Sequence, residues 1–475
     1  MTSSISLTKA VTLLTISILI IFAGLLFVKA PAAIVLITAG IAAIIISLLW
    51  GIKWEDIEND IVDTLRKVLL PILIMFGVGM LIGAWMLAGT IPVIIYYGLL
   101  ILKPSIFLVA AALACALMSL MTGTSWGTIG TIGVALMGVS IGFGIPPHYS
   151  AAAIVAGSYF GDKLSPLSDG TIMAAALTEV NIVEHIKHLL YTTVPVFIIS
   201  LILYIFLGFQ LDEQVQNTKN IELIMSTLDA HFNLNPILLL PPLVVLFLIF
   251  KQKPTLPVFG IGILLGCILA IFFQGRSLLE IAQTLNNGFT DTTNVKVVNE
   301  MLQQGGLSSM YSTVAVIFAA ALFGAPLRTS GAFHVILEKI IKVAKTGKTM
   351  MASCLSIHGL FYTITGSWYV SFSVFGPMLA PLYDKYGLHR KNLSRTLEDS
   401  GSAFGPAIPW STTGVFIAST LKVPTSEFIL YTPVVYLAVV FALIYIFTGY
   451  GIAKADTKHL PEEMKDNVKK AAAFN

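Results

Sequence analysis

The sequence predicts an all-α integral membrane protein built from two inverted repeats, each with about five membrane spans and one re-entrant hairpin. Of its 475 residues, 56% are hydrophobic and only 11% are charged, whereas soluble proteins carry about 25% charged residues. Apolar runs of roughly 18 to 25 residues, the length that crosses a bilayer, recur from one end of the chain to the other. An internal repeat divides the chain into two halves.

The apolar runs suffice for ten membrane spans, and no soluble domain fits between them. The predicted spans cover residues 10–28, 32–50, 68–88, 150–177, 190–208, 236–250, 256–273, 311–330, 398–420 and 429–450. The first run lacks a clear small-residue cleavage site, so we interpret it as a span rather than a signal peptide. Two further stretches, 105–140 and 350–382, are interrupted by Gly, Ser and Thr. Both are predicted to be re-entrant hairpins.

The basic residues between the spans predict that both chain termini lie in the cytoplasm, because Lys and Arg collect on that side. With the N-terminus inside, the basic loops 332–348 and 384–395 share the cytoplasmic side, and the acidic loop 211–235 falls outside. The net charge of +3 is too small to suggest a nucleic-acid partner. The lipid bilayer is the partner that the composition predicts.

Four short patterns recur about 240 residues apart, in the same order. The clearest is Thr122-Gly-Thr-Ser-Trp126, which recurs as Thr365-Gly-Ser-Trp368, with tryptophans 242 residues apart. We predict a first repeat at 1–235, a second at 236–455 and a cytoplasmic tail at 456–475. Each half has an odd number of crossings, so the second is predicted to be inverted. Inverted halves whose broken helices meet at the bilayer midplane are typical of secondary transporters.

Both hairpin tips carry hydroxyl groups, free carbonyls and the beginning of a helix. The candidate residues are Thr122, Thr124, Ser125 and Trp126 in the first tip, and Thr365, Ser367 and Trp368 in the second. Carbonyl and hydroxyl oxygens suit a hard cation such as Na+, and a helix N-terminus suits a carboxylate. The alternative is that the small residues only allow tight helix packing.

Residues 123–127 also satisfy the G-x-S-x-G pattern of serine hydrolases, with Ser125 at its centre. That motif requires a strand before the turn, whereas a long hydrophobic run precedes this one. We therefore do not expect an enzyme.

The stretch Gly157-Ser-Tyr-Phe-Gly-Asp-Lys-Leu-Ser-Pro-Leu-Ser-Asp-Gly170 places charges inside an apolar segment. A charge at the bilayer centre costs about 2.5 to 3.5 kcal/mol. These charged side chains are therefore expected either to have a function or to be neutralised. Burial raises the pKa of a carboxylate and a bound cation lowers it, so such a group binds either Na+ or H+. The predicted ion and proton ligands are Asp162, Ser165, Ser168 and Asp169, with Na+ at Asp162 and Asp169. Alternatively, Asp162 forms a buried ion pair with Lys163. If it does not, Lys163 is expected to modulate the charge of the carboxylates or to bind an anionic substrate.

The corresponding stretch of the second half, 404–414, has hydroxyls where the first has carboxylates. Its candidate residues are Ser411, Thr412 and Thr413, with Glu398 and Asp399 upstream. We predict a neutral counterpart of the ion site there, facing an organic substrate. For Glu398 and Asp399 we favour a helix-end ion pair with Arg395, three and four residues before them.

Three histidines and three cysteines carry ordinary structural interpretations. His358 lies in an apolar run and is predicted to be a core histidine, whereas His185 and His188 are predicted to lie on a solvated face of a cytoplasmic loop. Three cysteines without metal-ligand spacing are predicted to be buried thiols.

The motif 157–169, together with Glu398-Asp-Ser-Gly401 and Ile408-Pro-Trp410, closely resembles the signatures of the NhaC family of Na+/H+ antiporters within the ion transporter superfamily. The resemblance covers nearly the whole chain. It implies Na+/H+ exchange in a bacterial inner membrane, with Na+ and H+ as cargo and no cofactor. It also suggests a mobile core that moves by an elevator-like alternating-access mechanism in a homodimer. Some relatives exchange malate for lactate, and others take up amino acids.

Two departures from the family pattern remove an asparagine each. Gly170-Thr-Ile172 stands where the family commonly has Thr-Thr-Asn, and Ser411-Thr412 stands where it has Asn-Thr. These changes leave room for an organic substrate. We expect a Na+-coupled secondary antiporter; the alternatives are a Na+/H+-coupled exchanger of small carboxylates such as malate and lactate, and then a Na+-coupled amino-acid transporter. From other classes, a channel and an intramembrane hydrolase also stay open.

Overall fold

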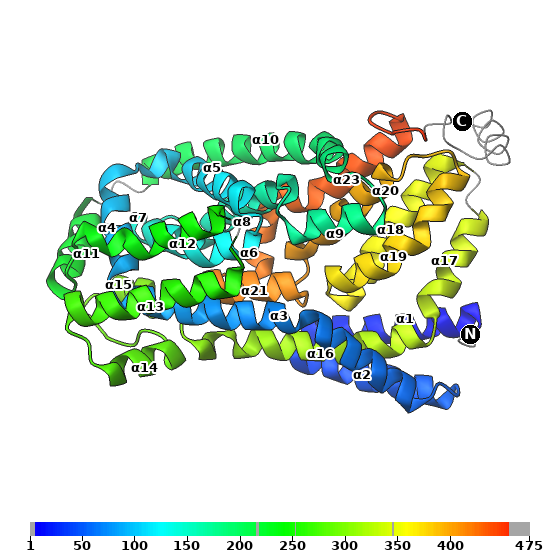
Figure 1. The fold of residues 1–475 in the computed structure, drawn as a ribbon, viewed down its shortest axis with the longest axis horizontal. Coiled ribbons are helices and arrows are strands. Elements are labelled where there is room, and N and C mark those ends of the chain that lie inside the picture. Colours follow the sequence, from blue (N-terminus) through cyan, green and yellow to red (C-terminus); the bar gives the residue numbers. More distant parts are fainter. Residues whose placement is uncertain (1–4, 215–217, 252, 344–345, 456–475) are drawn as a thin grey trace.

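A computed structural model describes residues 5–214, 218–251, 253–343 and 346–455, and these are almost entirely helical (Figure 1). Within these ranges the β structure consists of one isolated antiparallel bridge between Leu388 and Lys454. The predicted all-α class is therefore confirmed. The predicted tail at 456–475 lies outside the described residues.

The first half of the chain supplies helices of very different lengths. They are α1 (Leu7–Phe22), α2 (Ala32–Leu49), α3 (Trp54–Leu87), α4 (Thr90–Ile101), α5 (Pro104–Thr122), α6 (Ser125–Thr128), α7 (Val134–Phe143), α8 (Pro147–Leu164), α9 (Asp169–Leu177), α10 (Ile182–Gln214) and α11 (Thr218–His231).

The second half repeats this mixture of long and short helices. They are α12 (Leu240–Phe250), α13 (Thr255–Gln274), α14 (Leu278–Asn287), α15 (Lys296–Leu302), α16 (Tyr311–Thr329), α17 (Ala332–Val343), α18 (Gly347–Thr365), α19 (Trp368–Lys385), α20 (Lys391–Leu397), α21 (Thr412–Leu421), α22 (Thr425–Phe428) and α23 (Pro433–Thr448).

Eight helices of the described residues are long and apolar enough to cross a membrane, or up to ten if each bent pair is one span. The predicted spans 150–177 and 398–420 are broken in the structure, as α8–α9 and α20–α21. The predicted outer loop 211–235 is mostly helical, which corrects the sequence interpretation. Its helix α11 buries Ile224 and Leu228 in the core, and an apolar stripe of this kind stabilises a helix that is otherwise polar.

Both predicted hairpins are present as pairs of helices that turn back at a glycine. The first turns at Gly123, whose φ of 69° lies in the left-handed region that favours glycine. The rings of Phe107 and Phe143 are 5.9 Å apart, so the second arm returns to the level where the first begins. In the second hairpin, α18 and α19 turn at Gly366, which has a φ of 63°. That either hairpin is re-entrant stays a prediction, because this depends on the membrane position.

Each hairpin tip touches the break of the next broken span in its own half. A Cβ on Gly123 would collide with the backbone of Leu167, between α8 and α9. In the second half, the Thr412 N–H donates to the Gly366 carbonyl oxygen at 2.9 Å. Both halves therefore have a contact of this kind, while the repeat boundaries and the inversion of the halves stay predictions.

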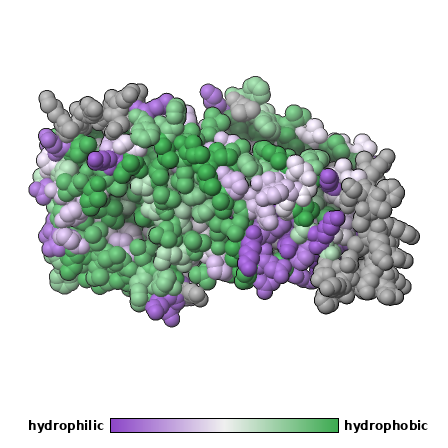
Figure 2. Space-filling model, turned by 90° about the horizontal axis from the view of Figure 1, so that it is seen from above, coloured by the Kyte–Doolittle hydropathy of each residue, from purple (hydrophilic) through white to green (hydrophobic). Residues whose placement is uncertain are grey.

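The broken helices lie in the middle of the molecule. Figure 1 shows α1, α2 and α17 towards one end of the long axis and α11 to α15 towards the other, with α8, α9 and α21 between them. Hydrophobic side chains cover most of the face in Figure 2, with hydrophilic side chains gathered at one end and in one area beside the middle. Such a surface suits a protein surrounded by lipid.

Two glycines of α8 allow it to lie directly against α5. A Cβ on Gly157 would overlap with the carbonyl oxygen of Ala112, and one on Gly161 with that of Ala116. Small residues four apart let membrane helices approach this closely. The end of α8, which carries Asp162, is thereby fixed against the first arm of the hairpin.

Gly161→Ala is expected to force α8 away from α5, at a cost of about 1–3 kcal/mol for overpacking. The purified variant should unfold at a lower temperature in detergent than the unchanged protein. Gly260→Ala is the matched control, because a Cβ there meets nothing within 4 Å. Equal melting temperatures for both variants would contradict the close packing of α5 and α8.

Candidate functional site

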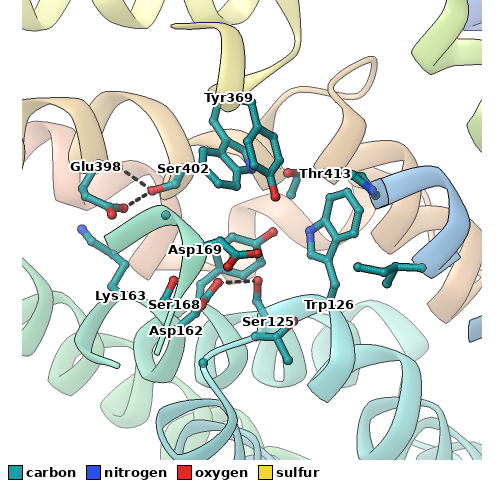
Figure 3. A pocket seen from close by; sticks show the side chains of 17 residues that line it. Ser125, Trp126, Asp162, Lys163, Ser168, Asp169, Tyr369, Glu398, Ser402 and Thr413 are labelled. Carbon is teal, nitrogen blue, oxygen red and sulfur yellow. Dashed lines mark hydrogen bonds between the residues drawn. The ribbon is translucent and has the colours of Figure 1, made fainter. Parts of the chain in front are cut away.

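A cavity of about 70 Å³ lies where the two hairpin tips meet the two broken spans. Its wall is formed by α3, the tip of the first hairpin, the last turns of α8 and the first turn of α9. The tip of the second hairpin, the turn after α20 and the start of α21 complete it (Figure 3). Ten of the predicted residues line it: Thr124, Ser125, Trp126, Asp162, Lys163, Ser168, Asp169, Trp368, Glu398 and Thr413. Segments far apart in the sequence thus meet at one polar site.

The break between α8 and α9 follows from its sequence. Proline cannot donate to the helix ladder, and Pro166 stands directly after the last turn of α8. The Thr171 hydroxyl lies 3.3 Å from the Lys163 carbonyl oxygen and 3.4 Å from that of Asp162, so it satisfies acceptors left at the helix end. Asp169 opens α9, where the helix dipole favours a negative charge.

One carboxylate oxygen of Asp162 accepts a hydrogen bond, and the other has no hydrogen-bond partner in the described part of the chain. The Ser125 hydroxyl of the first tip donates to Oδ2 at 2.7 Å (Figure 3). Oδ1 is buried and accepts no hydrogen bond from any described residue. A carboxylate oxygen in this state is a ready ligand for a proton or a hard cation.

Lys163 pairs across the molecule with Asp399, and not with its neighbour Asp162. The Lys163 Nζ and Asp399 Oδ1 atoms are 2.6 Å apart, with side chains only 5% and 0% exposed. The Thr192 hydroxyl donates to the same Asp399 oxygen at 3.0 Å. This buried pair joins α8 to the turn after α20, and the alternative pairing of Asp162 with Lys163 is not observed.

The expected ion pair of Glu398 and Asp399 with Arg395 is also replaced. Arg395 donates to the carbonyl oxygen of Gly451 at 3.0 Å. After α20 the chain continues as a π-helical turn, Glu398–Ser402, and the wider turn changes which side chains share a face. Asp399 therefore reaches Lys163 while Glu398 lines the cavity.

Glu398 resembles Asp162 in having one satisfied and one open oxygen. The Ser402 hydroxyl donates to Oε2, and Oε1 is buried without a hydrogen-bond partner among the described residues. A Cβ on Gly170 would lie 3.6 Å from Oε1. The glycine at this departure from the family pattern therefore leaves space beside Glu398.

Several predicted residues have local roles away from the cavity wall. The Ser165 hydroxyl accepts from the Leu167 N–H at 3.3 Å. Ser411 caps α21 by accepting from the Gly414 N–H at 2.8 Å, and the Thr365 hydroxyl donates to the Phe361 carbonyl oxygen at 2.9 Å. Thr412 ties α21 to the second tip. The buried hydroxyls of Thr122 and Ser367 have no hydrogen-bond partner within the described ranges.

The cavity also includes residues that the sequence interpretation missed. Tyr159, Tyr369 and Ser402 line it, together with Pro71 and Ile74 of α3. Tyr159 stands three residues before Asp162, on the same face of α8, and this spacing was available as a signal. The Trp126 ring stacks on Phe416 with centroids 4.8 Å apart, which ties the first tip to α21.

The histidine predictions divide. His358 is fully buried and lies 2.8 Å from the Ser400 hydroxyl, which confirms a core histidine. His185 and His188 are 0% and 5% exposed, so their predicted solvated face is wrong. Their helix α10 begins at Ile182, and its first turns pack against α20.

The donor set suits an exchangeable monovalent cation. Among the described residues, no group of three or more His, Cys, Asp and Glu side chains could hold a metal ion. Asp162, Asp169 and the hydroxyls of Ser125 and Ser168 nevertheless line one small cavity. Hard cations prefer oxygen ligands, and few charges favour release as well as binding. Ser125 follows a helix and donates to Asp162, which does not match the strand and nucleophile of a hydrolase.

Comparison with known proteins identifies close relatives along most of the chain. A model of the Na+/H+ antiporter family matches residues 1–173 and 157–450. The chain is 35% identical to the Na(+)/H(+) antiporter NhaC of Alkalihalophilus pseudofirmus, over 93% of this chain and 96% of that protein. It is 34% identical to the malate-2H(+)/Na(+)-lactate antiporter of Bacillus subtilis, over 94% and 95%. It is also 34% identical to the arginine/ornithine antiporter ArcD of Halobacterium salinarum, over 88% and 86%.

Lys163→Met is expected to lower stability by about 3–5 kcal/mol, because the buried charge of Asp399 loses its partner. Asp399→Leu should lower stability by a similar amount, because Lys163 is then buried without its partner. The double variant should recover most of the loss, since it leaves neither charge. Thermal unfolding of all three proteins in detergent measures this. Single variants as stable as the unchanged protein would contradict the pair.

Proposed function

The chain belongs to the Na+/H+ antiporter family, and we propose that it is a Na+-coupled secondary antiporter that exchanges Na+ for protons by alternating access. The observation that carries the proposal is Asp162. Asp162 lines the cavity, Ser125 fixes one of its carboxylate oxygens, and the other oxygen is buried without a hydrogen-bond partner among the described residues.

Competition at one carboxylate couples the two ions. When Na+ occupies the Asp162 oxygens, a proton cannot bind there, and when the carboxyl group is protonated it loses the charge that attracts Na+. Asp169 and Ser168 lie on the same wall and would complete the coordination. Exposure of this cavity to each side of the membrane in turn would then exchange one ion for the other.

The contacts around the cavity suggest what moves. The broken spans and hairpin tips are tied to one another by the Lys163–Asp399 pair and the Trp126–Phe416 stack. Pro71 and Ile74 of the long helix α3 form the facing wall. We propose that the tied elements move as one body along α3, in an elevator-like step within a homodimer. A bacterial inner membrane with cytoplasmic termini is part of the same proposal.

Exchange of small carboxylates is the second candidate. The malate/lactate antiporter is similar along nearly its whole length, Lys163 lines the cavity, and Gly170 leaves space beside Glu398. A carboxylate substrate would have to compete with Asp399 for Lys163. Amino-acid transport, which the arginine/ornithine relative represents, ranks third.

Proteoliposomes containing a pH-sensitive dye distinguish these candidates. A Na+ gradient is imposed alone, then with malate, lactate or an amino acid. Proton movement driven by Na+ alone supports Na+/H+ exchange. Movement that appears only with an organic acid or amino acid would contradict it and favour the corresponding alternative.

Asp162→Asn is expected to abolish Na+-driven proton movement in this assay, because an amide neither takes up a proton nor attracts Na+ with a full charge. The variant should still elute as a monodisperse protein. Asp229→Asn is the control, since Asp229 is exposed on α11. An Asp162→Asn protein that exchanges Na+ for protons at the normal rate would eliminate the proposed ion site.

A further inference from the structure

At the wall of the cavity, the buried side chains of Glu398 and His185 face each other. Their Nε2 and Oε1 atoms are 4.0 Å apart, and the side chains are 0% and 2% exposed. Neither atom has a hydrogen-bond partner among the described residues. Buried polar atoms are normally hydrogen-bonded, so two unpartnered atoms that face each other need an explanation.

We assign the proton of neutral His185 to Nδ1 from the hydrogen bonds of Ser394. The Ser394 hydroxyl donates its single hydrogen to the carbonyl oxygen of Lys391 at 3.0 Å. It therefore accepts from the His185 Nδ1–H, 2.7 Å away. A neutral imidazole has only one N–H, so its Nε2 lone pair points towards Glu398.

Two acceptors that face each other in a buried site are unfavourable when the carboxylate is ionised. One proton between them removes the conflict, as a carboxylic acid that donates to Nε2 or as an imidazolium beside a carboxylate. The separation of 4.0 Å exceeds a normal hydrogen bond of about 2.7–3.2 Å, so proton binding would draw the two side chains together.

We propose that the His185–Glu398 pair binds one proton and is a second proton-binding site of exchange, in addition to the site at Asp162 where Na+ and protons compete. The inference rests on the proposed antiport and adds a second site to it. The pair lies next to the cavity, because Glu398 and its hydrogen-bond donor Ser402 both form part of the cavity wall.

Other charges surround the pair without neutralising it. Among the titratable and charged groups on the packed elements are Asp162, Lys163, Asp169, Glu184, Lys187, His188, His358, Tyr383, Asp384, Lys385, Lys391, Arg395 and Asp399. Lys163, the cation on the cavity wall, is paired with Asp399. Arg395 is directed to the Gly451 carbonyl oxygen. His185 is therefore the group with which the Glu398 carboxylate can share a proton.

An open pocket lies close to His185 along α10. The pocket measures about 450 Å³ and is lined by Glu184, Lys187, His188, Lys391 and neighbouring residues. His188 stands one turn after His185 on α10, and its Nε2 lies 3.2 Å from the Asn392 amide oxygen. His188 of this pocket and His185 of the pair are therefore neighbours on one helix, while Glu398 of the pair lines the ion cavity.

The test is the pH profile of Na+-driven proton movement by His185→Asn in proteoliposomes. Asparagine can still donate to Ser394 but offers no titratable nitrogen to Glu398. The pH of half-maximal exchange is expected to fall by about one unit, a tenfold change in proton concentration. A second variant, Glu398→Gln, keeps an oxygen that accepts from the Ser402 hydroxyl. It is expected to lower the pH of half-maximal exchange by the same amount.

His358→Asn is a closely matched control. His358 is also fully buried, lies 2.8 Å from a serine hydroxyl, that of Ser400, and has an unpartnered Nε2 within the described residues. Its ring lies beside Phe372 and Phe375, with centroids 5.8 and 5.4 Å away. Its pH profile should match that of the unchanged protein.

The outcomes separate this inference from the proposed function. Shifted profiles in both test variants, with an unshifted control, support the proton-binding pair. Unshifted profiles in both test variants, or an equal shift in the control, overturn it while leaving Na+/H+ exchange intact. If His185→Asn is inactive, the Glu398→Gln profile decides alone. Absence of Na+-driven proton movement in the unchanged protein would instead refute the proposed function.

Discussion

Carboxylate oxygens that are buried without donors are the constraint on which this structure depends. Asp162, Glu398 and Asp399 each have one oxygen satisfied by a serine, a threonine or a lysine and one that no described residue satisfies. Leaving an acceptor unsatisfied in a protein interior costs free energy. Such oxygens are available to bind small cations and protons, which is the use that the proposed function assigns to them.

The packing around these oxygens keeps them apart from one another and from solvent. Gly157 and Gly161 bring α8 against α5, which fixes Asp162 beside the first hairpin tip. The Lys163–Asp399 pair then holds α8 against the turn after α20. That turn directs Glu398 towards both the cavity and His185. One network of close contacts therefore links the proposed Na+ site with the proposed proton site.

The fold class, both hairpins and both breaks could be predicted from the sequence because they depend on local composition. Apolar length identifies the helices, and Gly123, Pro166 and Gly366 mark the points where a helix must end. The pairing of charges could not be predicted, since it depends on contacts across more than two hundred residues. From the sequence, Lys163 is the alternative partner of its neighbour Asp162 and Arg395 is the favoured partner of Glu398 and Asp399, whereas the structure joins Lys163 to Asp399. Similarly, His185 stood near charged residues in the sequence, and only the packing of α10 against α20 shows that it is buried.

The central claim is that Na+ and protons compete for the carboxylates of one cavity. Calorimetric titration of Na+ into the detergent-solubilised protein at a series of pH values tests it most directly. Competition predicts that the apparent Kd for Na+ rises as the pH falls, approaching about tenfold per pH unit for one competing proton. An apparent Kd that does not change with pH would contradict the account.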